Sequence, residues 1–140
     1  MRSFIIACVL LSLVILFVCL NSFATVRTLD EMLSLSAMLP ETAEDFRLRY
    51  EDYRPTAEKL WSLWNEKFSR IAFTAGYENT NRCDEAIGAL KIHFQNKNAQ
   101  DFTVSLSEFR DALKRLRHLE SFPHFSLRKE KWDKRNEKAH

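Results

Sequence analysis

The sequence predicts an all-α protein in which an N-terminal transmembrane helix is followed by an antiparallel three- to four-helix bundle. Three observations support this prediction. The first 26 residues hold a long uncharged apolar run, the apolar residues after it recur every three or four positions, and the 140 residues include only two Gly and three Pro. A spacing of three and four is the period of an amphipathic helix. So few turn-forming residues argue against a sandwich or barrel built from hairpins.

Composition limits the class of protein further. The chain is 46% hydrophobic and 29% charged, which excludes an intrinsically disordered chain, and its length suits one small domain. The isolated glycines Gly76 and Gly88 cannot form a Gly-rich phosphate loop. We expect a transmembrane anchor (or signal peptide) at residues 1–26 and a juxtamembrane first helical segment at 27–54. A bundle core at residues 55–122 and a basic C-terminal tail at 123–140 should follow.

The N-terminal segment from Ser3 to Val26 has no charged residue, and it is almost wholly apolar from Phe4 to Leu20. A helix of about 20 residues spans the roughly 30 Å hydrocarbon layer of a membrane. Two interpretations compete, an uncleaved anchor and a secretory signal that is cleaved after Ala24. The apolar run is longer than the roughly 7–15 residues of a typical signal, and this favours the anchor.

The charges that flank this segment predict its orientation. Arg2 and the amino terminus precede it, whereas Arg27 after it is offset by Asp30, Glu31 and Glu41. This bias places the N-terminus in the cytoplasm and the rest of a single-pass cell membrane protein outside it. The basic tail lies too far along the chain from the span to count in this comparison. Both interpretations of the segment export the body.

The first helices of the body follow from the apolar spacing. Residues 28–39 are expected to extend the anchor helix, and residues 41–53 to form a helix after a kink at Pro40. Pro55 is expected to open the next helix, and Gly76 with the polar run 79–81 to end it. The apolar face of that helix consists of Leu60, Trp61, Trp64, Phe68, Ile71 and Ala75.

The last two helices show the clearest pattern. One has its apolar side at Cys83, Ala86, Ile87, Leu90 and Phe94 and ends at the loop 96–98. The other begins at an Asn98 cap, because Asp101 follows three residues later, and it is expected to end at Pro123. Its apolar residues step by four and three through Phe102, Leu106, Phe109, Leu113 and Leu116. Short loops between successive helices predict antiparallel neighbours.

Catalytic and metal chemistry find little support in the sequence. A metal site in a helix bundle needs a second ligand three or four residues away on the same face, but the residues three before His93, His118 and His124 are not ligands. Cys83 is the only thiol of the polar body and has no His near it in sequence. We expect Cys83 to be a small buried apolar side chain, with an intermolecular disulfide as the alternative. The sequence therefore predicts no enzyme, no metal and no cofactor.

Two surfaces are candidate contact sites. The first is the basic tail, which either frays in solvent or contacts a membrane or a protein partner through Arg128, Lys129, Lys131, Trp132, Lys134, Arg135 and Lys138. The second is an aromatic stripe, which is either core or a docking patch and consists of Trp61, Trp64 and Phe68.

Several short motifs carry a resemblance to a known family. They are Trp64-Asn65-Glu66-Lys67, Tyr77-Glu78, Asp84-Glu85-Ala86-Ile87, Arg117-His118-Leu119-Glu120 and Phe125-Ser126-Leu127. Over residues 28–128 the chain resembles an uncharacterised domain-of-unknown-function family of small single-anchor helical proteins of spore-forming Firmicutes. The resemblance implies a helical fold with one anchor and implies no activity. The chain departs from that family at Tyr77, where His is frequent, and at the basic tail.

These observations lead to one hypothesis about function. We expect a non-catalytic, membrane-anchored, extracytoplasmic helical module that binds or scaffolds an envelope protein partner. The alternative is an extracytoplasmic bundle that senses a small molecule or binds a lipid surface. Nucleic acid is disfavoured as a partner because the body is exported. The partner's identity and the oligomeric state are left open.

Overall fold

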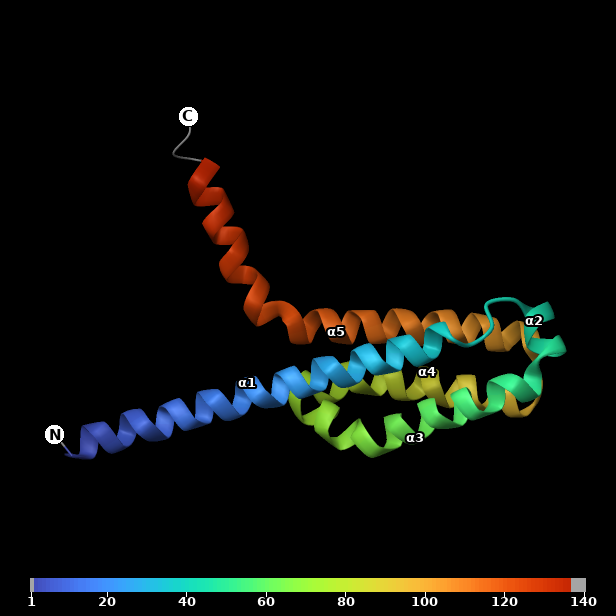
Figure 1. The fold of residues 1–140 in the computed structure, drawn as a ribbon, viewed down its shortest axis with the longest axis horizontal. Coiled ribbons are helices and arrows are strands. Elements are labelled where there is room, and N and C mark those ends of the chain that lie inside the picture. Colours follow the sequence, from blue (N-terminus) through green and yellow to red (C-terminus); the bar gives the residue numbers. More distant parts are fainter. Residues whose placement is uncertain (1, 137–140) are drawn as a thin grey trace.

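The computed structural model describes the backbone of residues 2–136 and the side chains of residues 3–121. In this range the chain is helical, with no strand. The helices are α1 (Arg2–Ala37), α2 (Ala43–Leu48), α3 (Tyr50–Ala75), α4 (Tyr77–Gln95) and α5 (Ala99–Asn136) (Figure 1). The all-α prediction is confirmed.

The first helix has two different halves. Its N-terminal half projects beyond the other helices, whereas its C-terminal half lies alongside them (Figure 1). By length and composition the helix is able to cross a membrane, and its most apolar stretch has no residue buried inside the structure. The helix continues without a break to Ala37, as expected for an extension of the anchor. One continuous helix thus joins the apolar segment to the folded body.

The four long helices surround a common core. Contacts join α1 to α3, α3 to α4, α4 to α5 and α5 back to α1, so each long helix has two close neighbours in a closed ring. The short α2 covers one end, where it contacts α3 and α5. All five helices contribute buried side chains, including Leu29, Phe46, Trp64, Leu90 and Phe109.

The apolar stripe of α5 is buried as predicted. Phe102, Leu106, Phe109, Leu113 and Leu116 are each no more than 1% exposed. The Asn98 cap is also confirmed, because its side-chain oxygen accepts the backbone N–H of Asp101 at 3.3 Å. Cys83 is fully buried, which fits the expectation of a small apolar core side chain.

The predicted boundaries around Pro55 were wrong. Residues 41–53 are not one helix, because α2 ends at Leu48 and α3 begins at Tyr50, five residues before Pro55. A local network fixes this early start, since the Tyr53 hydroxyl donates to Asp45 at 2.5 Å across the break between the helices. Pro55 therefore lies inside a helix, where its missing N–H costs one backbone hydrogen bond.

The end of α3 at Gly76 is as predicted, but the role of the polar run 79–81 and the end of α5 differ from the prediction. The connection from α3 to α4 is Gly76 alone, at φ 83°, so the polar run 79–81 lies inside the first turns of α4. The backbone of α5 continues past Pro123 to Asn136 and changes direction in its last third (Figure 1). A proline lacks the N–H of one helical hydrogen bond, and it kinks a helix as readily as it ends one.

Candidate functional site: the junction of the apolar helix with the bundle

The site is the place where α1 leaves the bundle. There the Ser22 hydroxyl donates to a Glu120 carboxylate oxygen at 3.3 Å, which links α1 to α5. The hydroxyls of Thr25 and Thr74 lie 3.2 Å apart and link α1 to α3, and Thr25 is fully buried. The bundle therefore begins directly after the apolar run of α1 ends at Leu20.

A cavity of about 350 Å³, open to solvent, lies at this junction. Its apolar lining comes from Phe17 and Val18 of α1, Phe73 of α3 and Leu119 of α5. Its polar lining consists of Asn21, Ser22, Thr74 and Glu120. The cavity thus has an apolar part and a polar part, and it brings three helices to the same level of the molecule.

Large apolar side chains are exposed around the junction. Phe73 is 80% exposed, Phe23 70% and Tyr77 66%. The sequence prediction missed Phe73, which lies two residues after the buried Ile71 and so on nearly the opposite side of α3. The sequence signal that could have identified Phe73 is a large apolar residue that lies off the predicted apolar face near the end of a helix.

Glu120 is the titratable group at this junction. Partial burial raises the pKa of its carboxyl, and the hydrogen bond from Ser22 opposes this effect. Because the pKa is higher in the folded state, protonation of Glu120 stabilises the folded protein. This stabilisation is fully present below the pKa that Glu120 has in the unfolded chain. It is lost as the pH rises through the folded pKa.

We therefore expect Glu120→Gln to raise Tm at pH 7 by about 1–3 °C. The difference in Tm between the variant and the native protein should become smaller when the pH is lowered from 7 to about 4.5. Thermal unfolding of the full chain in detergent measures both effects. Glu58→Gln removes an exposed carboxylate of α3 and is the control. A lower Tm for Glu120→Gln at pH 7 would show that the charged carboxylate stabilises the junction.

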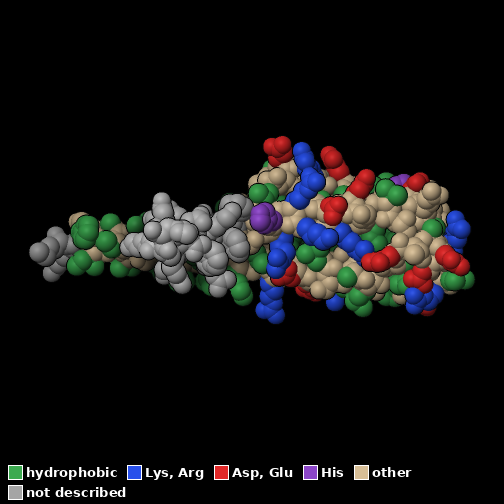
Figure 2. Space-filling view, turned by 90° about the horizontal axis from the view of Figure 1, so that it is seen from above, with side chains coloured by type: hydrophobic (Ala, Val, Ile, Leu, Met, Phe, Trp, Pro, Cys, Tyr) green, Lys and Arg blue, Asp and Glu red, His purple; other side chains and the backbone are tan. Residues whose placement is uncertain are grey.

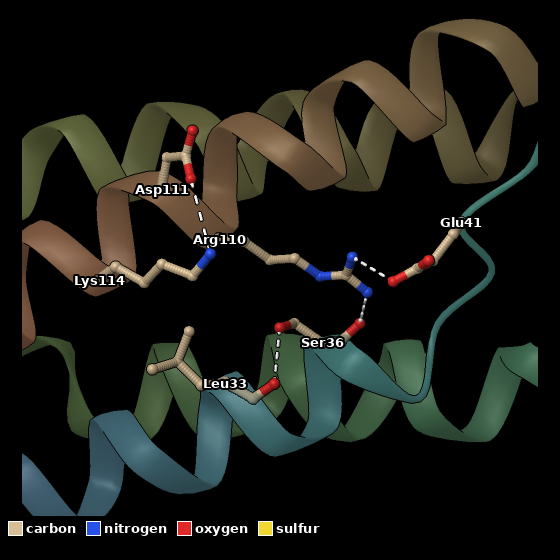
Figure 3. Close-up of polar contacts among 6 residues, drawn as sticks. All are labelled: Leu33, Ser36, Glu41, Arg110, Asp111 and Lys114. Atoms are coloured by element: carbon tan, nitrogen blue, oxygen red, sulfur yellow. Dashed lines mark hydrogen bonds and ion pairs between the residues drawn. The ribbon is translucent and has the colours of Figure 1, made fainter.

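The opposite end of α1 is held by Arg110 of α5. Its guanidinium donates to the backbone carbonyl of Ser36 at 2.5 Å and pairs with Glu41 at 3.2 Å (Figure 3). The last turn of α1 has no basic residue of its own. Arg110 supplies the positive charge that favours a helix C-terminus, where carbonyl groups lack intrahelical partners.

A third link lies between these two. Arg117 of α5 forms a bidentate ion pair with Asp30 of α1, and both side chains are exposed to solvent. Lys59 of α3 also lies 3.8 Å from Glu31 of α1. The C-terminal half of α1 is thus connected to α5 at its start, middle and end.

We expect Arg110→Met to lower the free energy of unfolding by about 1–2 kcal/mol, because it removes a charged hydrogen-bond donor from the end of α1. Lys114→Met is the control, since Lys114 lies one turn further along α5 and makes only a 3.9 Å exposed pair with Asp111 (Figure 3). Urea unfolding of the full chain in detergent measures both. Equal effects of the two variants would mean that Arg110 does not hold the end of α1.

The structure divides the aromatic stripe that the sequence singled out. Trp64 is 1% exposed, and its indole N–H donates to Asp84 at 2.7 Å, so it belongs to the core. Trp61 and Phe68 are partly exposed. The Lys91 ammonium lies 5.7 Å from the centre of the Trp61 ring. The docking interpretation therefore suits only Trp61 and Phe68.

The side chains of the predicted tail contacts lie outside the described residues, and Lys138 lies beyond the described backbone. The structure does show where the tail begins. Ser121 follows Glu120, whose carboxylate binds Ser22 of α1, 98 residues away in sequence. The basic tail therefore starts beside the end of the apolar segment.

A second cavity, of about 390 Å³, forms a groove between α4 and α5. Leu119 lines this groove and the junction cavity, so the two adjoin. Its charged lining consists of Arg82, Glu85, Glu108, Asp111 and Arg115. Basic and acidic side chains are interleaved over the face of the bundle seen in Figure 2, whereas the projecting end of α1 shows hydrophobic side chains.

The described side chains include no group of three or more His, Cys, Asp or Glu that is able to hold a metal ion. Burial raises the pKa of the Cys83 thiol to about 12, so this thiol is a poor nucleophile at neutral pH. Comparison of the chain with protein-family models, curated proteins and solved structures found no match. The resemblance to the spore-former family stays a prediction.

Proposed function

We propose that this chain is a non-catalytic, single-pass membrane protein whose extracytoplasmic antiparallel four-helix bundle binds or scaffolds an envelope protein. The observation that supports this best is the division of α1. One continuous helix has an apolar half that projects without partners and a second half that contributes Leu29, Met32 and Leu35 to the core. The span and the bundle thus share one helix.

The helix around Ala24 favours an anchor over a cleaved signal. Ala24 lies in the middle of α1, and its carbonyl accepts the Thr28 hydroxyl at 2.9 Å. The next residue, Thr25, is fully buried against the bundle. Cleavage after Ala24 would place a charged amino terminus at this buried residue, and burial of an unpaired charge is costly. These contacts support an uncleaved α1.

The groove between α4 and α5 is the surface that suits a protein partner. It exposes both signs of charge within one depression, and complementary charges give protein interfaces their specificity. Because the groove adjoins the junction through Leu119, its partner would lie close to the membrane surface. A membrane protein, or a protein held at the membrane, fits this position.

The test is a pull-down of the tagged full-length chain from native membranes after mild crosslinking. We expect a specific protein that is recovered in stoichiometric amounts. Arg82→Glu with Arg115→Glu should lower its recovery about tenfold, because like charges placed at an interface repel the partner. Arg47→Glu with Arg54→Glu makes the same change of charge on exposed sites of α2 and α3 and is the control.

Three results would contradict the proposal. Repeated recovery of the chain without a specific protein would remove the scaffold function. Undiminished recovery with the groove variant would show that the partner binds elsewhere. Equal losses with the groove and control variants would indicate a general effect of charge instead of a docking site.

A further inference from the structure

The base of the bundle lies at the depth of the last apolar turn of α1. Phe73 and Leu119 line the same cavity as Phe17 and Val18, which belong to the apolar run that ends at Leu20. At 1.5 Å per residue, Phe17 lies only about 6 Å along the helix from Asn21, the first residue after the apolar run. Phe73 and Leu119 are therefore level with the end of the span.

This depth corresponds to the interfacial layer of a membrane. Headgroups and the boundary region add about 5–8 Å on each side of the hydrocarbon core. If residues 4–20 of α1 lie in hydrocarbon, Phe73 and Leu119 lie at the boundary between acyl chains and headgroups. Tyr and Trp are enriched at this boundary, where the ring contacts acyl chains and its polar group reaches water.

The base exposes side chains suited to that layer. Phe73 and Leu119 are 80% and 46% exposed, and Tyr77, one residue after the α3–α4 connection, is 66% exposed. We call Phe73, Tyr77 and Leu119 the basal surface. Monomeric soluble proteins seldom expose large apolar side chains together without an interaction to cover them.

Four polar side chains beside the basal surface already have partners. The hydroxyls of Thr25 and Thr74 bond to each other, and the Ser22 hydroxyl bonds to Glu120. The Thr74 hydroxyl also lies 3.1 Å from the carbonyls of Arg70 and Ile71. Polar groups with internal partners cost little to move into a less polar medium.

We propose that the basal surface inserts into the interfacial layer of the bilayer that α1 crosses, so that lipid covers Phe73, Tyr77 and Leu119. This inference rests on the proposed membrane anchor and adds a second contact with the same membrane. The continuity of the surface with Phe17 and Val18 identifies the occupant as lipid. Two contacts, the span and the base, fix the orientation of the bundle relative to the membrane.

The test places a fluorophore at three heights of the full chain. A Cys8→Ala/Cys19→Ala background receives Ser12→Cys in the span, Phe73→Cys in the basal surface or Leu48→Cys on α2 at the far end of the bundle. Each new thiol is labelled with an environment-sensitive maleimide dye. Cys83 is kept, because it is fully buried and its thiol pKa is about 12. Phe73 and Leu48 are 80% and 77% exposed, so both labels lie on the surface of the folded protein.

Labelled protein is reconstituted into phosphatidylcholine and phosphatidylglycerol vesicles that contain lipids with a nitroxide near the headgroup. We expect the dye at residue 73 to shift to shorter wavelength and to be quenched at least about threefold more than the dye at residue 48. Equal quenching at residues 73 and 48, with the residue 12 dye quenched by nitroxides placed deep in the acyl chains, overturns the inference and leaves the anchor intact. If the nitroxides deep in the acyl chains also leave the dye at residue 12 unquenched, the anchor is overturned together with the inference.

Discussion

Phe46→Ala is expected to remove a large part of the stability of the bundle, although α2 is only six residues long. Phe46 is 1% exposed, and its ring lies 4.6 Å from that of Phe102 and 5.5 Å from that of Phe94. Truncation of a buried Phe costs about 3–5 kcal/mol, because it removes apolar burial and leaves a cavity. Native domains are stable by only about 5–15 kcal/mol.

Urea unfolding of the full chain in detergent, followed by tryptophan fluorescence, measures this loss. Trp61 reports on the same cluster, since its ring lies 5.4 Å from that of Phe94. We expect the midpoint to fall by about 2 M urea. Leu48→Ala, on the same helix at a side chain 77% exposed, should change stability by no more than about 0.5 kcal/mol. Similar losses in both variants would mean that α2 does not cap the core through Phe46.

Leu10→Arg with Val14→Arg is expected to release the protein from membranes. Both residues lie near the middle of the apolar run and are more than half exposed, so neither contributes to the bundle core. Each Arg at the centre of a span costs about 2.5–3.5 kcal/mol on the insertion scale, or about 5–7 kcal/mol together. That cost offsets most of what the apolar residues contribute to insertion.

Carbonate extraction of membranes from expressing cells measures this effect. The protein retained after extraction should fall by at least about tenfold in the double Arg variant. Leu10→Ala with Val14→Ala shortens the same side chains without adding charge, and it should be retained like the native chain. Retention of the Arg variant would show that this segment does not hold the protein in the membrane.

The sequence predicts best where periodicity alone decides the structure. The stripe from Phe102 to Leu116 and the burial of Cys83 follow from the spacing of apolar residues. Which face of a helix is buried can be predicted from neighbouring residues alone, without knowledge of distant contacts. The early start of α3 could not be predicted in this way. It depends on the contact of Tyr53 with Asp45 across a break at Arg49, and such a contact competes with the local tendency of Pro55 to begin a helix.

The site depends on contacts between residues far apart in the chain. Ser22 and Glu120 are 98 residues apart, and Ser36 and Arg110 are 74 apart, so no local pattern brings them together. The aromatic stripe was ambiguous for a related reason. Spacing places Trp61 and Trp64 on one face, but only the packing of α4 decides that Trp64 is enclosed and bonded to Asp84.

The account depends most on α1 being one uncleaved helix that joins a membrane span to the bundle. The most direct measurement is the intact mass of the untagged protein in carbonate-washed membranes and in the soluble exported fraction. The account predicts the 16.5 kDa chain, with its apolar segment, in the washed membranes alone. A shorter chain that begins at Thr25 in the soluble fraction would contradict it.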